Sequence, residues 1–171
     1  MTKHVPGPEA TPFTGVRVTH RSTLAFDEVR SRLRSRLGEV TVPEIARLSM
    51  ETGSAQEFEE RMRPLLGGSG FVLMAEIDHG AWMHRVGIHR RLVRWIFGNP
   101  IIAATMLRHD ATAGLFVPVE LLIEEAVPAA GCTVTYVRPS SLIAVGDNRE
   151  LLVAAQALDA KVEAFLTSSG I

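Results

Sequence analysis

The sequence predicts an α+β fold: a two-layer sandwich of a mainly antiparallel sheet with helices packed on it, plus an inserted pair of helices. Three observations support this fold class. The 171 residues are 46% apolar with a formal net charge of −1, which excludes global disorder and suits one hydrophobic core. Short apolar runs of strand length alternate with segments whose apolar residues recur at helical spacing. The last two predicted strands are separated by a short loop containing Pro and Gly, which indicates a hairpin and antiparallel pairing.

The first elements follow from alternation and from capping residues. Residues 15–20 read GVRVTH, in which apolar and polar residues alternate as in a half-buried strand. Ser22 or Thr23 is expected to cap the helix that follows, because short hydroxyl side chains accept hydrogen bonds from free backbone N–H groups. Two more helices are predicted within residues 39–70, and Ser54 is the expected cap of the second.

The middle of the chain predicts two strands and a sharply defined helix. Residues 71–77 form a nearly continuous apolar run of strand length, and residues 92–97 are the next predicted strand. Asn99 followed by Pro100 is the clearest local signal, because Asn is a strong helix cap and Pro is favoured at the first helical position. We therefore predict that a helix begins at this pair.

The end of the chain predicts a hairpin and a long helix. Residues 115–125 are interpreted as a strand, and residues 133–137 as its antiparallel partner. The last helix is expected to begin at Asp147, which stands three residues before Glu150 in the spacing of a capping box.

Composition limits the classes of function. A pI near 6.6 argues against a basic nucleic-acid binder. No stretch reaches the roughly 18 apolar residues of a membrane span, and residues 1–12 form a polar, flexible lead-in without the apolar core of a secretion signal. Because Cys132 is the single cysteine, we expect a cytoplasmic protein without an internal disulfide. Residues 13–171 are interpreted as one α+β domain in which residues 39–70 are the inserted helices.

Several short motifs occur together along the chain. They are Glu76-Ile77-Asp78, Gly98-Asn99-Pro100, Gly114-Leu115, Pro118 with the apolar run after it, and Thr135-Tyr136-Val137-Arg138-Pro139. Together with the strand and helix of residues 16–37, these motifs resemble the family called domain of unknown function 302. The resemblance implies a compact α+β sandwich that often pairs as a dimer, and it implies no settled activity. Many members carry Cys where this chain has Gly98, so no thiol role is implied here.

A cluster of polar residues ends the strand predicted at residues 71–77. Glu76 and Asp78 point to the same face of a strand, because side chains alternate, and His79 follows them. Two carboxylates beside an imidazole could divide the roles of proton donor and acceptor. The structural alternative is an ion pair between Glu76 and an arginine, with a turn made by Asp78 and Gly80.

A second cluster, Arg108-His109-Asp110, ends the helix that Asn99 begins. Arg108 could anchor a ligand carboxylate or phosphate, with His109 as base or donor and Asp110 orienting it. The structural alternative is that the two cations only stabilise the C-terminal end of the helix. The functional hypothesis requires that this cluster and Glu76 face one hollow.

Other side chains are weaker candidates for a site. Trp82 could line a ligand pocket, and Tyr136 and Arg138 share one face of a predicted strand. Residues 80–109 contain five arginines and no acidic residue, which indicates either a solvated face balanced by acidic neighbours or an anion-binding patch. The histidines between residues 79 and 89 are spaced by five, so they do not share a helix face and no metal site is assigned.

These observations favour a domain that binds a small organic or anionic ligand in a pocket between sheet and helices. The candidate catalytic residues are Glu76, His79, His109 and Asp110, and the candidate ligand-binding residues are Asp78, Trp82, Arg108, Tyr136 and Arg138. One alternative is a cofactor-independent enzyme that uses Glu76, His79 and His109 for proton transfer, and another is a haem or metal protein with histidine ligation. The cofactor is left unknown. The expected partners are a small-molecule ligand and a second copy in a homodimer, with no nucleic acid and no membrane.

Overall fold

Six strands form one sheet in the spatial order β1-β6-β5-β4-β3-β2. The computed structural model describes residues 7–127 and 130–171. Its strands are β1 (Arg17–Ser22), β2 (Gly38–Glu39), β3 (Val72–Asp78), β4 (Leu92–Gly98), β5 (Val119–Glu125) and β6 (Cys132–Val137). Adjacent strands are antiparallel, except that the short strand β2 runs parallel to β3. The predicted mainly antiparallel sheet is therefore confirmed.

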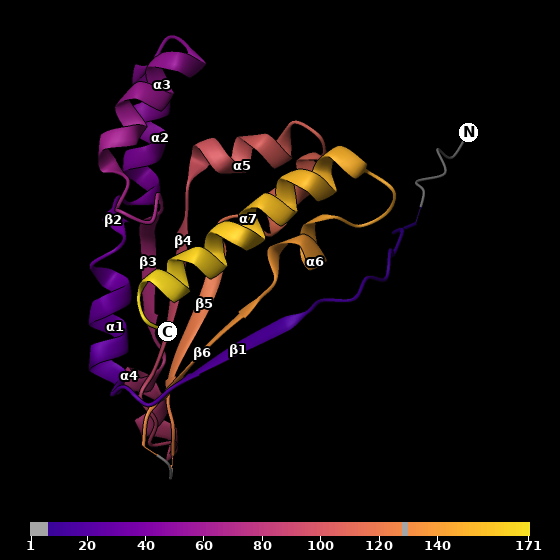
Figure 1. The fold of residues 1–171 in the computed structure, drawn as a ribbon. Coiled ribbons are helices and arrows are strands. Elements are labelled where there is room, and N and C mark those ends of the chain that lie inside the picture. Colours follow the sequence, from indigo (N-terminus) through magenta and orange to yellow (C-terminus); the bar gives the residue numbers. More distant parts are fainter. Residues whose placement is uncertain (1–6, 128–129) are drawn as a thin grey trace.

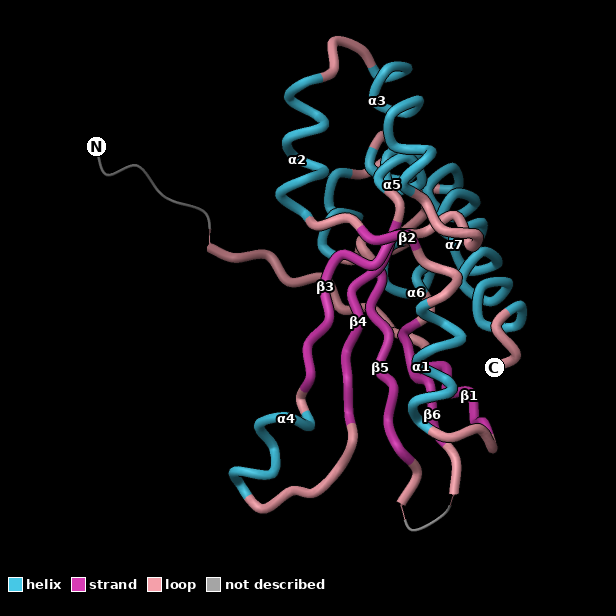
Figure 2. Tube along the Cα trace, turned by 90° about the vertical axis from the view of Figure 1, so that its left-hand side faces the viewer, coloured by secondary structure: helices cyan, strands magenta, loops and turns pink. Residues whose placement is uncertain are grey.

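The helices leave one face of the sheet open. They are α1 (Phe26–Arg34), α2 (Val42–Glu51), α3 (Ala55–Met62), α4 (Gly80–Met83), α5 (Pro100–Leu107), α6 (Pro139–Ile143) and α7 (Arg149–Ser168). Figure 1 shows α7 crossing the sheet, and α2 with α3 extending beyond its β2–β3 edge. In Figure 2, α1 and α7 lie on the same side of the strands. Within the part of the chain that the structure describes, no helix packs over β1, β6 and β5 on the opposite side, which we call the open face.

The main core lies between the sheet and the helices α1 and α7. Alternate strand residues enter it, because successive side chains of a strand point to opposite faces. The buried strand residues are Val93, Trp95 and Phe97 on β4, Val119, Leu121 and Ile123 on β5, and Cys132, Val134 and Tyr136 on β6. They meet an apolar stripe on α7, formed by Leu151, Ala155, Leu158, Val162 and Phe165. A second, smaller cluster joins α2 and α3 to the edge of β3 through Val40, Leu48, Met62 and Val72.

The helix predicted at Asn99 and Pro100 is confirmed. Asn99 Oδ1 accepts a hydrogen bond of 2.8 Å from the backbone N–H of Ile101. Its Nδ2 donates to the carbonyl oxygen of Gly70 at 2.9 Å. Asn99 is one of the few buried polar residues, so it fixes the start of α5 to the turn that precedes β3.

Two predicted helix caps are wrong. Helix α1 begins after Ala25 and has no side-chain cap, so neither Ser22 nor Thr23 caps it. Helix α7 is capped by Asn148, whose Oδ1 accepts from the backbone N–H of Leu151 at 3.0 Å, in place of the capping box expected at Asp147.

The strand predicted from residue 115 begins later. Residues Ala111–Leu115 form a short 3₁₀ helix, η3, and β5 starts only at Val119. Pro118 stands directly before it, and a proline has no N–H to donate to a strand ladder. Helix α6 was not predicted; it begins at Pro139, which has the fixed φ suited to a first helical position.

The buried Trp95 has its indole N–H satisfied by a carboxylate. The side chain is fully buried on β4, and Nε1 donates to Glu76 Oε2 on the neighbouring strand at 2.7 Å. The other oxygen of Glu76 accepts from Arg30 of α1. Sheet, aromatic core and helix are therefore joined through one carboxylate.

Replacing Asn99 tests the start of α5. The Asn99→Ala substitution removes the helix cap and leaves the Gly70 carbonyl without its donor, so we expect a loss of about 2 kcal/mol of unfolding free energy. Asn99→Asp keeps the capping oxygen and loses only the amide donor, so its loss should be smaller. Urea denaturation of the two variants gives both values. Equal stability of Asn99→Ala and the unchanged protein would contradict this account.

Replacing Glu76 tests the acceptor for Trp95. The Glu76→Ala substitution leaves a buried indole N–H unpaired, and we expect about 1–3 kcal/mol of destabilisation. Glu76→Gln retains an acceptor oxygen and should cost less. Arg32→Ala serves as a control, because Arg32 forms only a surface pair with Glu28 on the same helix. If Glu76→Ala unfolds at the same urea concentration as Arg32→Ala, the buried hydrogen bond does not stabilise the fold as described.

Candidate functional site

The cluster predicted at the end of β3 makes the contacts of its structural alternative. Glu76 pairs with Arg30 and accepts from Trp95, as described above. Asp78 Oδ1 accepts from the backbone N–H of Ala81 at 2.9 Å and so forms the turn into α4. His79 lies at the start of α4. The two carboxylates of this cluster thus have local structural contacts, and the proton-transfer roles proposed for the cluster stay predictions.

The hypothesis that Glu76 and His109 face a common hollow is wrong. Strands β3 and β4 are antiparallel, and Val72 at the start of β3 pairs with Gly98 at the end of β4. Helix α5 therefore leaves the sheet where β3 begins, whereas Glu76 and His79 lie towards the end where β3 finishes. Figure 2 shows α4 and α5 at opposite ends of the strands. A site shared by His79 and His109 is ruled out by the same arrangement.

The residues that follow α5 lie on the surface near α7. Arg108 Nε donates to the carbonyl oxygen of Ala104 at 3.2 Å, as expected of a cation at a helix C-terminus. Asp110 Oδ1 accepts from the hydroxyl and the backbone N–H of Thr112, and these hydrogen bonds lower the pKa of the Asp110 carboxyl. Arg108 and His109 line a shallow groove between α5 and α7, separate from Asp78 and Trp82.

Tyr136 and Arg138 do not share a cavity. Tyr136 is buried on the helix side of β6, and its hydroxyl donates to Glu163 of α7. Burial and this carboxylate raise the pKa of the Tyr136 hydroxyl far above its usual range. Arg138 lies beyond the end of β6 and is exposed. Trp82 is 54% exposed on α4, so it lies outside the core.

The basic stretch of residues 80–109 is largely balanced by acidic neighbours. Its ion pairs are Arg90 with Glu124, Arg91 with Asp27, and Arg94 with Glu120. The hydrogen bond from Arg91 lowers the pKa of the Asp27 carboxyl. These three arginines therefore fit the interpretation of a solvated face that is balanced by acidic neighbours.

A hollow with a volume of about 860 Å³ lies on the open face. We call it the trough. The register of the strands places its side chains in three rows. The rows are Arg17 with Val137, Thr19 with Thr135 and Leu122, and Arg21 with Thr133 and Glu124. Its volume lies within the range of small-molecule sites.

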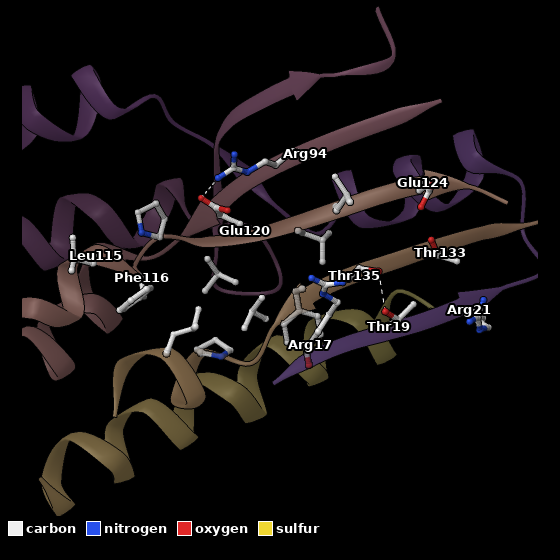
Figure 3. Close-up of a pocket in the computed structure, with 18 residues that line it drawn as sticks. Arg17, Thr19, Arg21, Arg94, Leu115, Phe116, Glu120, Glu124, Thr133 and Thr135 are labelled. Atoms are coloured by element: carbon white, nitrogen blue, oxygen red, sulfur yellow. Dashed lines mark hydrogen bonds and ion pairs between the residues drawn. The ribbon is translucent and has the colours of Figure 1, made fainter. Parts of the chain in front are cut away.

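The trough combines free cations, hydroxyls and an apolar end. Arg17 and Arg21 on β1 form no ion pair with a carboxylate anywhere in residues 7–127 and 130–171. Figure 3 shows Arg17 beside the hydroxyls of Thr19 and Thr135, which lie 3.1 Å apart. The apolar end is formed by Leu115, Phe116, Pro118 and Leu142. The arrangement suits a molecule with an anionic group and an apolar part.

Of the predicted ligand-binding residues, Tyr136 is among those that line the trough, and sequence reasoning did not assign the other lining residues to a ligand site. The alternation in residues 15–20 identifies Arg17 and Thr19 as the polar face of a strand, which in most proteins is a solvated face. No local signal tells that Thr135 and Leu122 lie beside them, because β1 and β6 are paired across more than a hundred residues of sequence. The sequence also does not tell which face of the sheet receives the helices.

Three general features of the described residues complete the description. Among them, no group of three or more His, Cys, Asp and Glu side chains is arranged to hold a metal ion. None of the helices that the structure describes is both long and apolar enough to cross a lipid bilayer. Cys132 is buried, and desolvation raises the pKa of its thiol to about 11.

Comparison with known proteins identifies the family. The model of the family described as "Domain of unknown function DUF302" matches residues 46–169. The fold is similar to the crystal structure of an uncharacterised conserved DUF302 protein from Bacillus stearothermophilus, with a TM-score of 0.62 and 16% sequence identity. The similarity covers 90% of this chain and 97% of that one. No curated protein matches the chain. Since the family model covers most of its length, the chain belongs to the DUF302 family.

Proposed function

We propose that this protein binds a small amphipathic organic anion, such as a carboxylate with an apolar body, in the trough on the open face of the sheet. The observation that carries the proposal is the pair Arg17 and Arg21. Both line the trough from edge strand β1 and have no carboxylate partner among the described residues. The site differs from the sequence-based hypothesis, since it lies on the face opposite α1 and α7.

The charge pattern within the trough supports an anionic ligand. Glu120 and Glu124 also line the trough, but Arg94 and Arg90 neutralise them. The remaining formal charge comes from Arg17 and Arg21, which lie four residues apart on one face of β1. A guanidinium group binds a carboxylate through two parallel hydrogen bonds, which a water molecule replaces poorly.

The neighbouring side chains support an apolar body on the same ligand. The hydroxyls of Thr19 and Thr135 can donate to an oxygen of the anionic group, since a hydroxyl rotates to suit its partner. Beyond Arg17, the wall becomes apolar at Val137, Leu142 and Phe116. Few polar contacts that fix orientation and a mainly apolar remainder are the usual composition of a small-molecule site.

Removing the cations should weaken binding. For hexanoate, we expect Arg17→Ala to raise Kd roughly tenfold to a hundredfold, because a charge-assisted hydrogen bond contributes about 1.5–3 kcal/mol. Titration calorimetry with hexanoate, hexyl phosphate and neutral hexanol measures this, and the two anions separate carboxylate from phosphate recognition. Arg149→Ala at the start of α7 is the matched control, because Arg149 is exposed and outside the trough.

Two results would overturn the proposal. One is that neither anion binds at millimolar concentration. The other is that Arg17→Ala and Arg149→Ala bind hexanoate equally. Sedimentation of the unchanged protein is measured in parallel, because the homodimer expected from the family resemblance stays a prediction. If a second copy covers the open face, Arg17→Ala changes the oligomeric state and hexanoate does not bind, which also excludes the ligand proposal.

A further inference from the structure

We infer that a second, apolar cavity beside the trough receives the alkyl tail of the same ligand, and that Gly98 sets how long a tail fits. This inference rests on the proposed function, because it takes the anionic group to lie at Arg17. The cavity has a volume of about 350 Å³ and lies between α2, α5 and the end of the sheet. The ligand class is therefore a medium-chain alkyl carboxylate.

The cavity lies next to the trough, at the end of the sheet where β4 finishes and β5 begins, and its lining includes Met106 of α5 and Leu158 of α7 from the helix side. On β5, Val119 is buried in the core, so Pro118 and Glu120 on either side of it face the open side. On β4, Gly98 lies beside Pro118: a Cβ atom at Gly98 would be 3.1 Å from Pro118 Cβ. The trough and the cavity share Pro118 and Val119 in their walls. Because the two hollows share these wall residues, we infer that one ligand reaches from the trough past Pro118 into the cavity.

The lining of the cavity admits an apolar group and offers nothing to a polar one. Its walls include Val42 and Ile45 of α2, Met74 of β3, Ala103 of α5, and Pro118. Among the described residues that line it, Asn99 alone has a polar side chain. Both polar atoms of that amide are already used, one as the cap of α5 and the other on the Gly70 carbonyl. A polar ligand group here would lose its hydrogen bonds to water without replacement.

The distance from the cations fits a chain of moderate length. Strands β6 and β5 lie between β1 and β4 in the sheet. The distance from β1 to β4 is therefore three strand spacings, or roughly 14 Å. The Arg17 side chain reaches over part of this distance. The short acids would then contact only the trough, whereas octanoate and decanoate would place their terminal methylenes near Gly98.

Gly98 keeps the floor of the cavity open. A Cβ atom there would lie 3.1 Å from Pro118 Cβ and 3.6 Å from Met74 Cε, both at the cavity wall. The backbone of Gly98 does not need glycine, because its φ is not positive. Any larger side chain would therefore occupy part of the space that we assign to the alkyl tail. The longest tail that fits would then be shorter.

The test is the dependence of Kd on chain length, measured by titration calorimetry with butyrate, hexanoate, octanoate and decanoate. In the unchanged protein, we expect each methylene that enters the cavity to tighten binding about fourfold. Gly98→Val, from the floor, and Ala103→Leu, from the α5 wall, should abolish the gain for octanoate and decanoate and leave butyrate binding unchanged. Ala104→Leu is the control, because Ala104 is the exposed neighbour of Ala103 and lies outside the cavity.

The outcomes separate this inference from the proposed function. If no carboxylate binds the unchanged protein, the proposed function fails and the inference fails with it. If short acids bind through Arg17 but octanoate and decanoate bind no tighter, only the inference is wrong. The inference alone is also wrong if both cavity variants keep the full chain-length dependence of the Ala104→Leu control. Thermal unfolding of each variant is recorded, and Ala103→Leu decides the result should Gly98→Val fail to fold.

Discussion

Helices cover this sheet on one side, and the rest of the structure depends on that asymmetry. The fully buried apolar residues of β4, β5 and β6 lie on the covered side, because α1 and α7 exclude water there. The strand residues that alternate with these buried residues then lie on the open face. There, the pairing of neighbouring strands brings polar groups into rows. The core and the trough are thus two consequences of the same alternation.

The contacts between the helix layer and the sheet have mainly structural roles. Glu76 satisfies Trp95 and pairs with Arg30, so a carboxylate that interrupts an apolar strand is compensated on the core side. Glu163 accepts from Tyr136 of β6 and lies 3.5 Å from His20 of β1, which joins α7 to the edge of the sheet. Because buried polar groups must find partners, these titratable residues are committed to holding layers together. The open face carries Arg17 and Arg21, which have no carboxylate partner among the described residues.

Membership of the DUF302 family agrees with this fold but does not identify a ligand. The similar structure from Bacillus stearothermophilus shares the fold at 16% identity, a level at which the side chains of a site are not transferable. The proposal of an amphipathic anion therefore stands on this chain's own residues: two arginines without carboxylate partners among the described residues, a pair of threonine hydroxyls and an apolar end. The cavity beside Gly98 extends the same surface into an apolar compartment.

The sequence by itself determined the elements whose signals are local. Asn99 and Pro100 start α5 because the cap and the fixed φ act within one turn, and the alternation on β1 follows from strand geometry. It also determined the structural alternative at Glu76, since a carboxylate in a buried run needs a cation. Only the tertiary structure decided which cation that is and which strands are neighbours. The antiparallel pairing of β3 with β4 separates Glu76 from His109, and the pairing of β1 with β6 joins Arg17 to Thr135. Such strand pairings connect segments that are far apart in the sequence. Which strands pair depends on how the apolar surface of the whole chain is buried together.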